Sequence, residues 1–254
     1  MTETIVVIDT ETTGLDAAKD AVVELAMVPV TVAELDVSKG NDQAQQWSIG
    51  RGHDTYVNPQ RPIPPETSAV HHIVDADVAE APLLGTAIID CAYVVAQHGA
   101  TTEARYICAA HNAPFDRAFL SPLKAYKWVC TYRCSLHLWP DAPGFGNQVL
   151  RYWLGLKVPH LGDAYYPRSV FPHSALYDAY VTAALLLKQL ETHSVSQLLE
   201  LSETPVILRT CRFGKHAGTP WAQVPKDYLS WASKQTFDGD VKFTIEHYLK
   251  AKAP

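Results

Sequence analysis

The sequence has no long hydrophobic run, no cysteine pairing pattern and no large excess of charge of one sign. No apolar run approaches the ~18 residues that suggest a membrane-spanning helix, and residues 1–4 lack the basic and hydrophobic regions of a signal peptide. The five cysteines include no CxxC pair, and an odd number fits a reducing compartment better than a disulfide framework. We therefore expect a cytoplasmic protein.

Charge is scarce and unevenly distributed. The net charge of −6 argues against a protein that coats nucleic acid by bulk electrostatics. Residues 205–254 contain eight basic and four acidic residues, a net charge of +4, which leaves −10 for residues 1–204. At 254 residues the chain has room for one large domain and a small appendage. We expect an acidic domain over residues 1–204 and a small basic module over residues 205–254.

The hydrophobic pattern predicts three strands and then alternating helices and strands. Expected strands are Ile5–Ile8, Ala21–Thr31, Asp54–Val57, Arg105–Ala110 and Lys127–Cys130. Expected helices are Pro82–Gln97, one after the N-cap Asn112, Thr131–Trp139, Asn147–Leu156 and Ser174–Glu191. The polar segment Val32–Arg51 suggests an extended hairpin or loop. This order predicts an α/β domain with a mixed central sheet.

The first strand runs straight into two carboxylates. Asp9 and Glu11 are two positions apart, so on a strand both side chains point to the same side. Thr12, Thr13 and Gly14 then suggest a turn. Adjacent like charges at the end of a buried strand repel unless something neutralises them, and a divalent metal is the obvious candidate.

A second acid stands at the start of another element. In the segment His111–Asp116 (HNAPFD), Asp116 falls in the first turn of the expected helix, where the helix dipole favours an anion. We expect its side chain to point back over the edge of the sheet where Asp9 lies.

The third acidic segment, His173–Asp178 (HSALYD), separates a histidine from an aspartate by five residues. On a helix that spacing rotates by ~500°, or about 140° net, so the two side chains cannot share a face. We therefore expect His173 in the loop that contains Pro172 and Asp178 on the helix. This combines a fixed ligand with a more mobile imidazole, which suits a general base.

Four converging carboxylates and a histidine are what two-metal phosphodiester hydrolysis requires. Oxygen ligands favour Mg²⁺ or Mn²⁺ over zinc. One ion helps to make hydroxide from water and the other stabilises the leaving oxygen, with the ions ~3.5–4 Å apart. His173 would accept the proton of the water.

These segments resemble the three motifs of the DEDDh 3′→5′ exonucleases, a family with a ribonuclease H-like fold. Asp9–Leu15 (DTETTGL) resembles the first motif, His111–Asp116 the second, and His173 with Asp178 the histidine form of the third. The sister class has a tyrosine four residues before the last aspartate, where this chain has Ser174.

The resemblance implies a ribonuclease H-like three-layer fold, with a mixed central sheet flanked by helices, and an active site with two Mg²⁺ or Mn²⁺ ions. Its implied metal ligands are Asp9, Glu11, Asp116 and Asp178, and its implied general base is His173. Residues implied near the 3′ end of the substrate are Thr12, Gly14, Leu15, His71, Asn112 and Phe115. A pocket that stacks the last base tolerates any sequence, because every base has a π-face.

The C-terminal segments Phe213–Gly218 and Tyr228–Trp231 resemble the small module of a bacterial exodeoxyribonuclease of the same family. We expect a small α+β module whose aromatic residues form a core. Its basic residues Arg212, Lys215 and Lys226 are candidates for contacts with the DNA backbone.

The sequence thus predicts a metal-dependent 3′→5′ exodeoxyribonuclease that releases nucleoside 5′-monophosphates in DNA repair, recombination or turnover. Its expected partner is a DNA 3′ end, single-stranded or duplex, and not a membrane. One alternative keeps the chemistry on RNA, as an exoribonuclease of the ribonuclease T or oligoribonuclease type. The other is a proofreading or adaptor subunit that acts through a polymerase.

Overall fold

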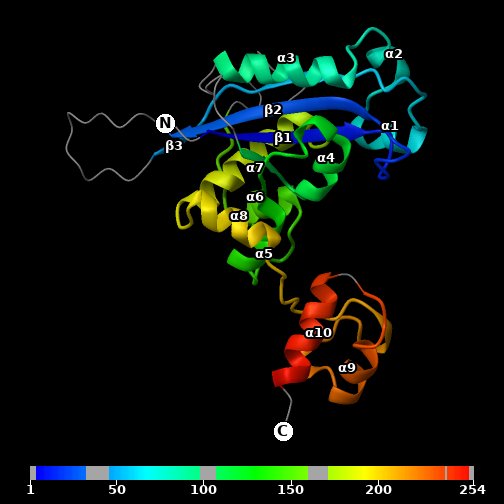
Figure 1. Ribbon diagram of the computed structural model, residues 1–254, viewed down its shortest axis with the longest axis vertical. Coiled ribbons are helices and arrows are strands. Elements are labelled where there is room, and N and C mark those ends of the chain that lie inside the picture. Colours follow the sequence, from blue (N-terminus) through cyan, green and yellow to red (C-terminus); the bar gives the residue numbers. More distant parts are fainter. Residues whose placement is uncertain (1–3, 33–45, 98–106, 160–170, 238, 252–254) are drawn as a thin grey trace, which may run out of the picture.

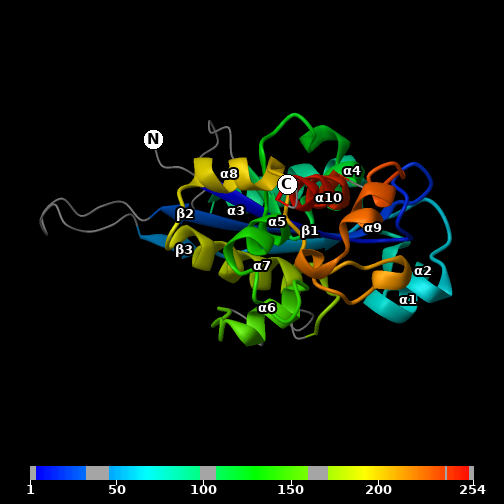
Figure 2. The same cartoon turned by 90° about the horizontal axis from the view of Figure 1, so that it is seen from below.

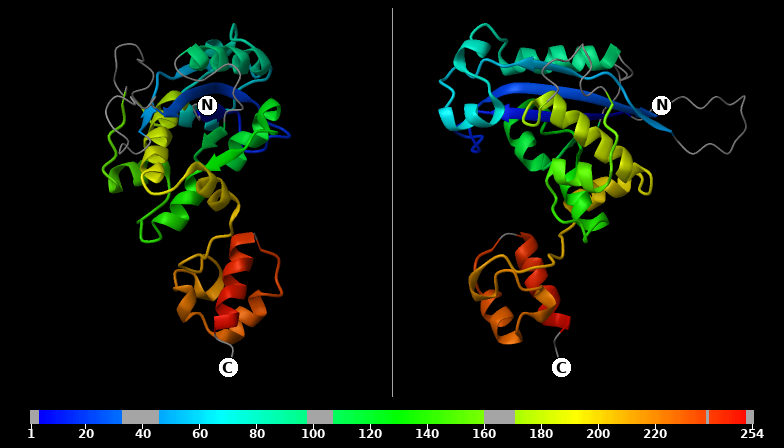
Figure 3. Two further views of the ribbon diagram at one scale, coloured as in Figure 1. Left: turned by 60° about the vertical axis from the view of Figure 1, so that its left-hand side comes forward. Right: turned by 180° about the vertical axis from the view of Figure 1, so that it is seen from behind.

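The computed structural model describes residues 4–32, 46–97, 107–159, 171–237 and 239–251. A larger body is built on one β-sheet, and a smaller C-terminal body lies below it at the end of a single connecting segment (Figure 1). Views from two other sides show the same separation (Figure 3).

The sheet is mixed, as the sequence predicted. Its strand order is β3-β2-β1-β5-β6, and β4 also pairs with β2. β1 runs antiparallel to β2 and parallel to β5, which is parallel to β6. The strands are β1 Thr4–Thr12, β2 Val22–Val32, β3 Trp47–Ile49, β4 His53–Tyr56, β5 Ile107–Ala110 and β6 Trp128–Cys130. Of the predicted hairpin or loop over Val32–Arg51, residues 33–45 lie outside the described residues.

β1 continues through both acids to Thr12, as predicted for a strand that runs into Asp9 and Glu11. Antiparallel pairing with β2 extends from Thr4 to Glu11, and a register shift follows between Glu11 and Thr12. Thr12 was predicted in the turn but still pairs with Val22 of β2, because a partner strand supports the backbone regardless of side-chain polarity. The turn accordingly begins after Thr12.

Helices cover both faces of the sheet and complete the three layers (Figures 1 and 2). Val6 and Ile8 pack on the side of α3, whereas Ile5 and Val7 pack on the side of α7, as strand alternation requires. The helices of this body are α1 Pro65–His71, α2 Asp75–Val78, α3 Leu84–Gln97, α4 Ala113–Phe119, α5 Thr131–Leu138, α6 Asn147–Trp153, α7 Ala175–Leu190 and α8 Val195–Glu203. None of the helices in the described ranges has the length and apolar character needed to cross a bilayer.

The C-terminal body has a hydrophobic core of its own. Trp221 is fully buried there among residues that include Cys211, Leu229 and Ile245. Its helical segments are η3 Gly214–His216, η4 Trp221–Gln223, α9 Lys226–Ala232 and α10 Gly239–Ala251. Among the described residues of this body, Thr210 and Pro220 form an isolated antiparallel bridge.

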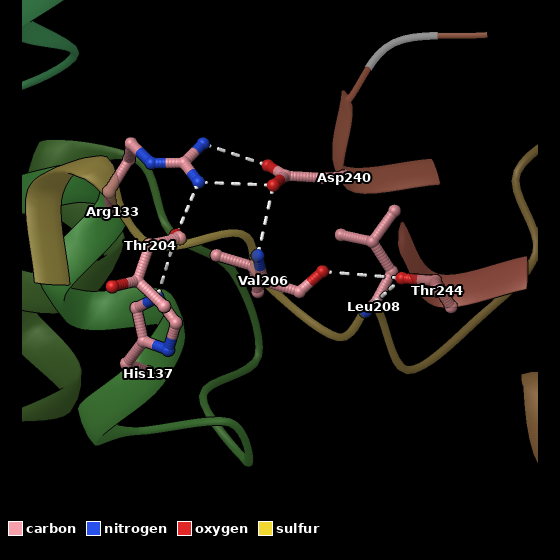
Figure 4. A network of polar contacts seen from close by, with 7 residues as sticks. All are labelled: Arg133, His137, Thr204, Val206, Leu208, Asp240 and Thr244. Atoms are coloured by element: carbon pink, nitrogen blue, oxygen red, sulfur yellow. Dashed lines mark hydrogen bonds and ion pairs between the residues drawn. The ribbon is translucent and has the colours of Figure 1, made fainter. Parts of the chain in front are cut away.

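A polar network fastens the C-terminal body to the larger one (Figure 4). Arg133 on α5 donates from both terminal nitrogens to the carboxylate of Asp240 on α10, at 2.8 and 3.0 Å. The same guanidinium donates to the carbonyl of Thr204 at 2.7 Å, and Asp240 accepts the backbone N–H of Val206 at 2.9 Å. Bidentate arginine–carboxylate pairs fix orientation as well as distance. The connecting segment is therefore held at both ends.

Candidate active site

Four carboxylates from three distant segments line one cavity of about 390 Å³. Asp9 and Glu11 lie on the last part of β1, Asp116 lies in the first turn of α4, and Asp178 in the first turn of α7. The parallel pairing of β1 with β5 brings the start of α4 to the edge where the two acids of β1 lie. The residues lining this cavity are Asp9, Thr10, Glu11, His111, Phe115, Asp116, Gly146, Asn147, Gln148, Val149, Pro172, His173 and Asp178.

Hydrogen bonds hold the acids of the helices in place. The hydroxyl of Thr10 donates to Asp116 at 2.8 Å, which ties β1 to α4. One oxygen of Asp178 accepts the backbone N–H of His173 at 2.8 Å, and the other accepts the side-chain amide of Gln148 at 3.0 Å. The carboxylate of Asp178 is thus oriented by groups that precede it in the chain.

His173 lies in the loop before α7, and its side chain is exposed. Its φ of 65° is left-handed, an unusual conformation for a residue with a side chain. Single ligand atoms of Glu11, His173 and Asp178 all lie within 4.8 Å of one another. The structure therefore brings the imidazole to the carboxylates, although it belongs to a different element.

Burial and mutual repulsion raise the pKa values of the acids. Burial raises the pKa of Glu11 to about 8, with further contributions from the charges of Glu24 and Asp178. Burial raises the pKa of Asp116 to about 7 against the hydrogen bond from Thr10. The pKa of Asp9 is raised well above its usual range, first by burial and then by the charge of Asp116. The group of acids therefore resists ionisation in the absence of a cation.

This donor set fits divalent cations. Carboxylate oxygens are the ligands that Mg²⁺ and Mn²⁺ prefer, and bound cations relieve the repulsion that raises these pKa values. The three ligand atoms of Glu11, His173 and Asp178 are close enough to share one ion.

Glu24 is a fifth acid that the sequence reading did not identify. It lies directly opposite Glu11 in the pairing of β1 with β2, and only 2% of it is exposed. Its side chain accepts the backbone N–H of Ala175 at 2.9 Å, at the start of α7. Glu24 therefore holds the N-terminus of the helix that carries Asp178. In the sequence, the signal for Glu24 was a single acidic residue within a mostly apolar strand.

His111 and Gln148 were also missed as lining residues. The ring nitrogens of His111 bond the hydroxyl of Thr131 at 3.0 Å and the carbonyl of Phe145 at 2.8 Å. Burial lowers the pKa of His111 to about 4, so its ring stays neutral near pH 7. His111 therefore connects the cavity to the loop before α6.

The six predicted substrate contacts lie in different environments. Of the six, Phe115 lines the cavity itself. Thr12 is buried and donates to the carbonyl of Gly14 at 2.6 Å, whereas the side chain of Leu15 is 86% exposed. Burial lowers the pKa of His71, and the charge of the nearby His173 acts in the same direction.

Asn112 occupies the predicted N-cap position of α4. Its φ is 72°, and its side chain makes no capping hydrogen bond. The residue is exposed beside His111, outside the lining of the cavity.

Comparisons with known proteins give one consistent result. The family model described as "Exonuclease" (RNase_T) matches residues 6–186. The chain is 31% identical over 251 residues to Exodeoxyribonuclease 10 of Escherichia coli strain K12, covering 96% of this chain and 98% of that protein. It is 32% identical over 195 residues to the DNA polymerase III subunit epsilon-like protein of Rhodobacter capsulatus, covering 74% of this chain but 24% of that protein.

Solved structures agree with this result. The structure titled "Exonuclease X in complex with 5′ overhanging duplex DNA" is similar with a TM-score of 0.58 and 30% identity, over 78% of this chain and 99% of that chain. The nuclease domain of 3′hExo, described as a DEDDh family member, is similar in fold with a TM-score of 0.53 and 14% identity, over 74% of this chain and 92% of that one. The ribonuclease H-like fold and the resemblance to a bacterial exodeoxyribonuclease, both predicted from the sequence, are confirmed.

Proposed function

The chain belongs to the RNase_T exonuclease family and is a 3′→5′ exonuclease, and on that premise we propose that it hydrolyses DNA from 3′ ends to nucleoside 5′-monophosphates, with two divalent metal ions and His173 as the general base. The observation that carries this proposal is the meeting of Asp9, Glu11, Asp116, Asp178 and the exposed imidazole of His173 at one cavity. DNA is proposed as the substrate because the similar proteins are an exodeoxyribonuclease and an exonuclease in complex with duplex DNA.

The proposed metal ligands are the four carboxylates Asp9, Glu11, Asp116 and Asp178. When bound, Mg²⁺ or Mn²⁺ supplies an activated water and stabilises the charge on the leaving oxygen. The chain holds these ligands rigidly, because two sit on a central strand and two in first helical turns. Rigid placement of charge before the reaction is what makes electrostatic catalysis effective.

His173 is the proposed acceptor of the proton from the attacking water. Its backbone N–H is bound to Asp178, which fixes the loop next to the acids, while its exposed ring stays accessible to water and substrate. The neutral ring of His111 is less suited to this role, because hydrogen bonds occupy both of its nitrogens. A base must lie within reach of the proton it accepts.

The terminal nucleotide is proposed to lie between β1 and α4. Phe115 lines the cavity and offers an aromatic face, and the exposed Leu15 offers an apolar contact outside it. The remaining proposed contacts are Thr12, Gly14, His71 and Asn112.

We propose residues 205–254 as a separate module that contacts DNA. The module has its own core, and its basic residues Arg212, Lys215 and Lys226 are exposed. Contacts with phosphates position a strand without reading its sequence, which suits a sequence-independent exonuclease.

The test is hydrolysis of matched single-stranded DNA, duplex DNA and RNA carrying a 5′ label, with Mg²⁺ and with EDTA. DNA should shorten from its 3′ end to nucleoside 5′-monophosphates, and Asp9→Ala should abolish this activity. Asp90→Ala is the matched control, because Asp90 is exposed on α3 and does not line the cavity. Equal activity in EDTA would refute the metal mechanism, and preference for RNA would refute the DNA assignment. Activity that appears only with a polymerase would indicate a proofreading subunit instead.

A further inference from the structure

We propose that the groove between the two bodies is a track for the DNA strand that extends from the catalytic cavity. The groove has a volume of about 560 Å³. One wall consists of Tyr132, Pro140 and Ala142–Gly146, and the other consists of Val206–Thr210 with Arg212. This inference rests on the proposed function, since it concerns the same substrate.

The groove adjoins the catalytic cavity. Gly146 lines both of them. The neighbouring carbonyl of Phe145 bonds the ring of His111, which lines the catalytic cavity. A strand whose 3′ end reaches the carboxylates therefore has a path past Gly146 into the groove.

The charge of the groove suits a polyanion. Arg212 is exposed and lines the groove. Arg209 also lines it, and pairs with Asp141 at 2.7 Å, where the side chains are 58% and 80% exposed. Exposed ion pairs contribute little free energy, so a phosphate can compete for this guanidinium. Because residues 1–204 carry a net charge of −10, these two arginines supply the positive charge that a strand leaving the acids needs.

The groove wall that belongs to the larger body adds an aromatic surface. Tyr132 lines the groove, with its ring centroid 5.7 Å from that of His111 and 6.4 Å from that of Phe145. Stacking on aromatic side chains combined with basic residues is the usual way to bind single strands without sequence preference.

The polar network holds the two walls of the groove in fixed positions relative to each other. The pair between Arg133 and Asp240 fixes α10 to α5, and the Asp240 carboxylate also holds the backbone of Val206 (Figure 4). The hydroxyl of Thr244 donates to the carbonyl of Val206 at 3.2 Å and accepts the N–H of Leu208 at 2.9 Å. Seen from below, the C-terminal body lies over the half of the sheet where β1 ends (Figure 2). The wall formed by the connecting segment thus faces the catalytic half of the molecule.

The experiment measures binding of a labelled oligothymidylate of about 20 nucleotides to the full chain in EDTA, which prevents turnover. Each phosphate contact contributes about 0.7 to the salt slope of single-strand binding. Between about 50 and about 200 mM salt, the Kd of the wild type should therefore rise about 2.6-fold more than that of Arg212→Gln. The difference should reach about sevenfold for Arg209→Gln/Arg212→Gln. Lys234→Gln is the matched control, because Lys234 is exposed in the same body and does not line the groove.

A second substrate separates failure of the track from failure of the proposed function. The p-nitrophenyl ester of thymidine 5′-monophosphate is too short to leave the catalytic cavity. With Mg²⁺, the wild type and Lys234→Gln should hydrolyse it at equal rates, whereas Arg212→Gln should have a higher KM than the wild type for the oligothymidylate. An unchanged salt slope in the arginine variants, or an equal change in Lys234→Gln, would overturn the track. A wild type that binds the oligonucleotide but hydrolyses neither substrate would overturn the proposed function instead.

Discussion

The crowded carboxylates should make the metal-free protein less stable as the pH rises. Burial raises the pKa of Glu11 from 4.5 to about 8 in the folded protein. Between these values, folded Glu11 keeps a proton that the unfolded chain has released. Unfolding therefore becomes easier with rising pH, and this effect begins near pH 4.5 and ends near pH 8.

The size of the effect follows from the shift. One proton difference changes the free energy of unfolding by about 1.4 kcal/mol per pH unit. The raised pKa of Glu11 alone should therefore lower the free energy of unfolding by about 3 kcal/mol between about pH 5 and about pH 7. Asp116, whose pKa is raised to about 7, acts in the same direction, and its effect ends near pH 7. A decrease of this size is a large fraction of the free energy of unfolding of an ordinary domain.

Urea unfolding followed by tryptophan fluorescence, in EDTA and in Mg²⁺, measures this slope. In EDTA the free energy of unfolding should fall with pH, and Mg²⁺ should restore most of it at the higher pH, because the ion binds the ionised carboxylates. Glu11→Gln should remove about 1.4 kcal/mol per pH unit from the slope. Glu80→Gln, at an exposed loop position, should leave the slope unchanged. A stability that does not vary with pH in EDTA, or a slope in Glu11→Gln equal to that of the wild type, would refute the reasoning.

Two further predictions concern His173 and the contact between the two bodies. His173→Gln should lower kcat by about 10²- to 10⁴-fold, as expected for loss of a general base, and should keep the stabilisation by Mg²⁺, whereas His193→Gln should change neither. Loss of the Mg²⁺ effect in His173→Gln would identify His173 as a ligand rather than a base. Arg133→Lys keeps the charge but not the bidentate contact with Asp240, so it should cost about 2 kcal/mol and speed hydrogen exchange at the amide of Val206. Arg61→Lys, at an exposed site, is the control, and equal exchange rates in the two variants would contradict this role.

Periodicity and helix geometry were enough to predict the elements that carry the acids. The apolar run before Asp9 indicated a buried strand, and the rotation of a helix separated His173 from Asp178. The turn after β1 was predicted one residue too early, because backbone pairing with β2, and not side-chain polarity, decides where the strand stops. The hydrophobic pattern of one segment does not show which strand it will pair with.

The residues that sequence reading missed act across long separations. The amide of Gln148 reaches Asp178 from a different helix, and His111 contacts the carbonyl of Phe145 34 residues away. Glu24 meets Glu11 only because the register of β1 against β2 places them opposite each other. None of these contacts has a local signature, since each depends on how elements pack after they have formed.

Glu24 adds to the need for a cation beside Glu11. It is buried, and the backbone of Ala175 holds its carboxylate in place, so it cannot move away from Glu11. Its charge is the largest electrostatic contribution that raises the pKa of Glu11. Glu11 is in turn within 4.8 Å of ligand atoms of His173 and Asp178. A cation bound by Glu11 and Asp178 would therefore relieve the repulsion between the acids of β1 and β2 at this point.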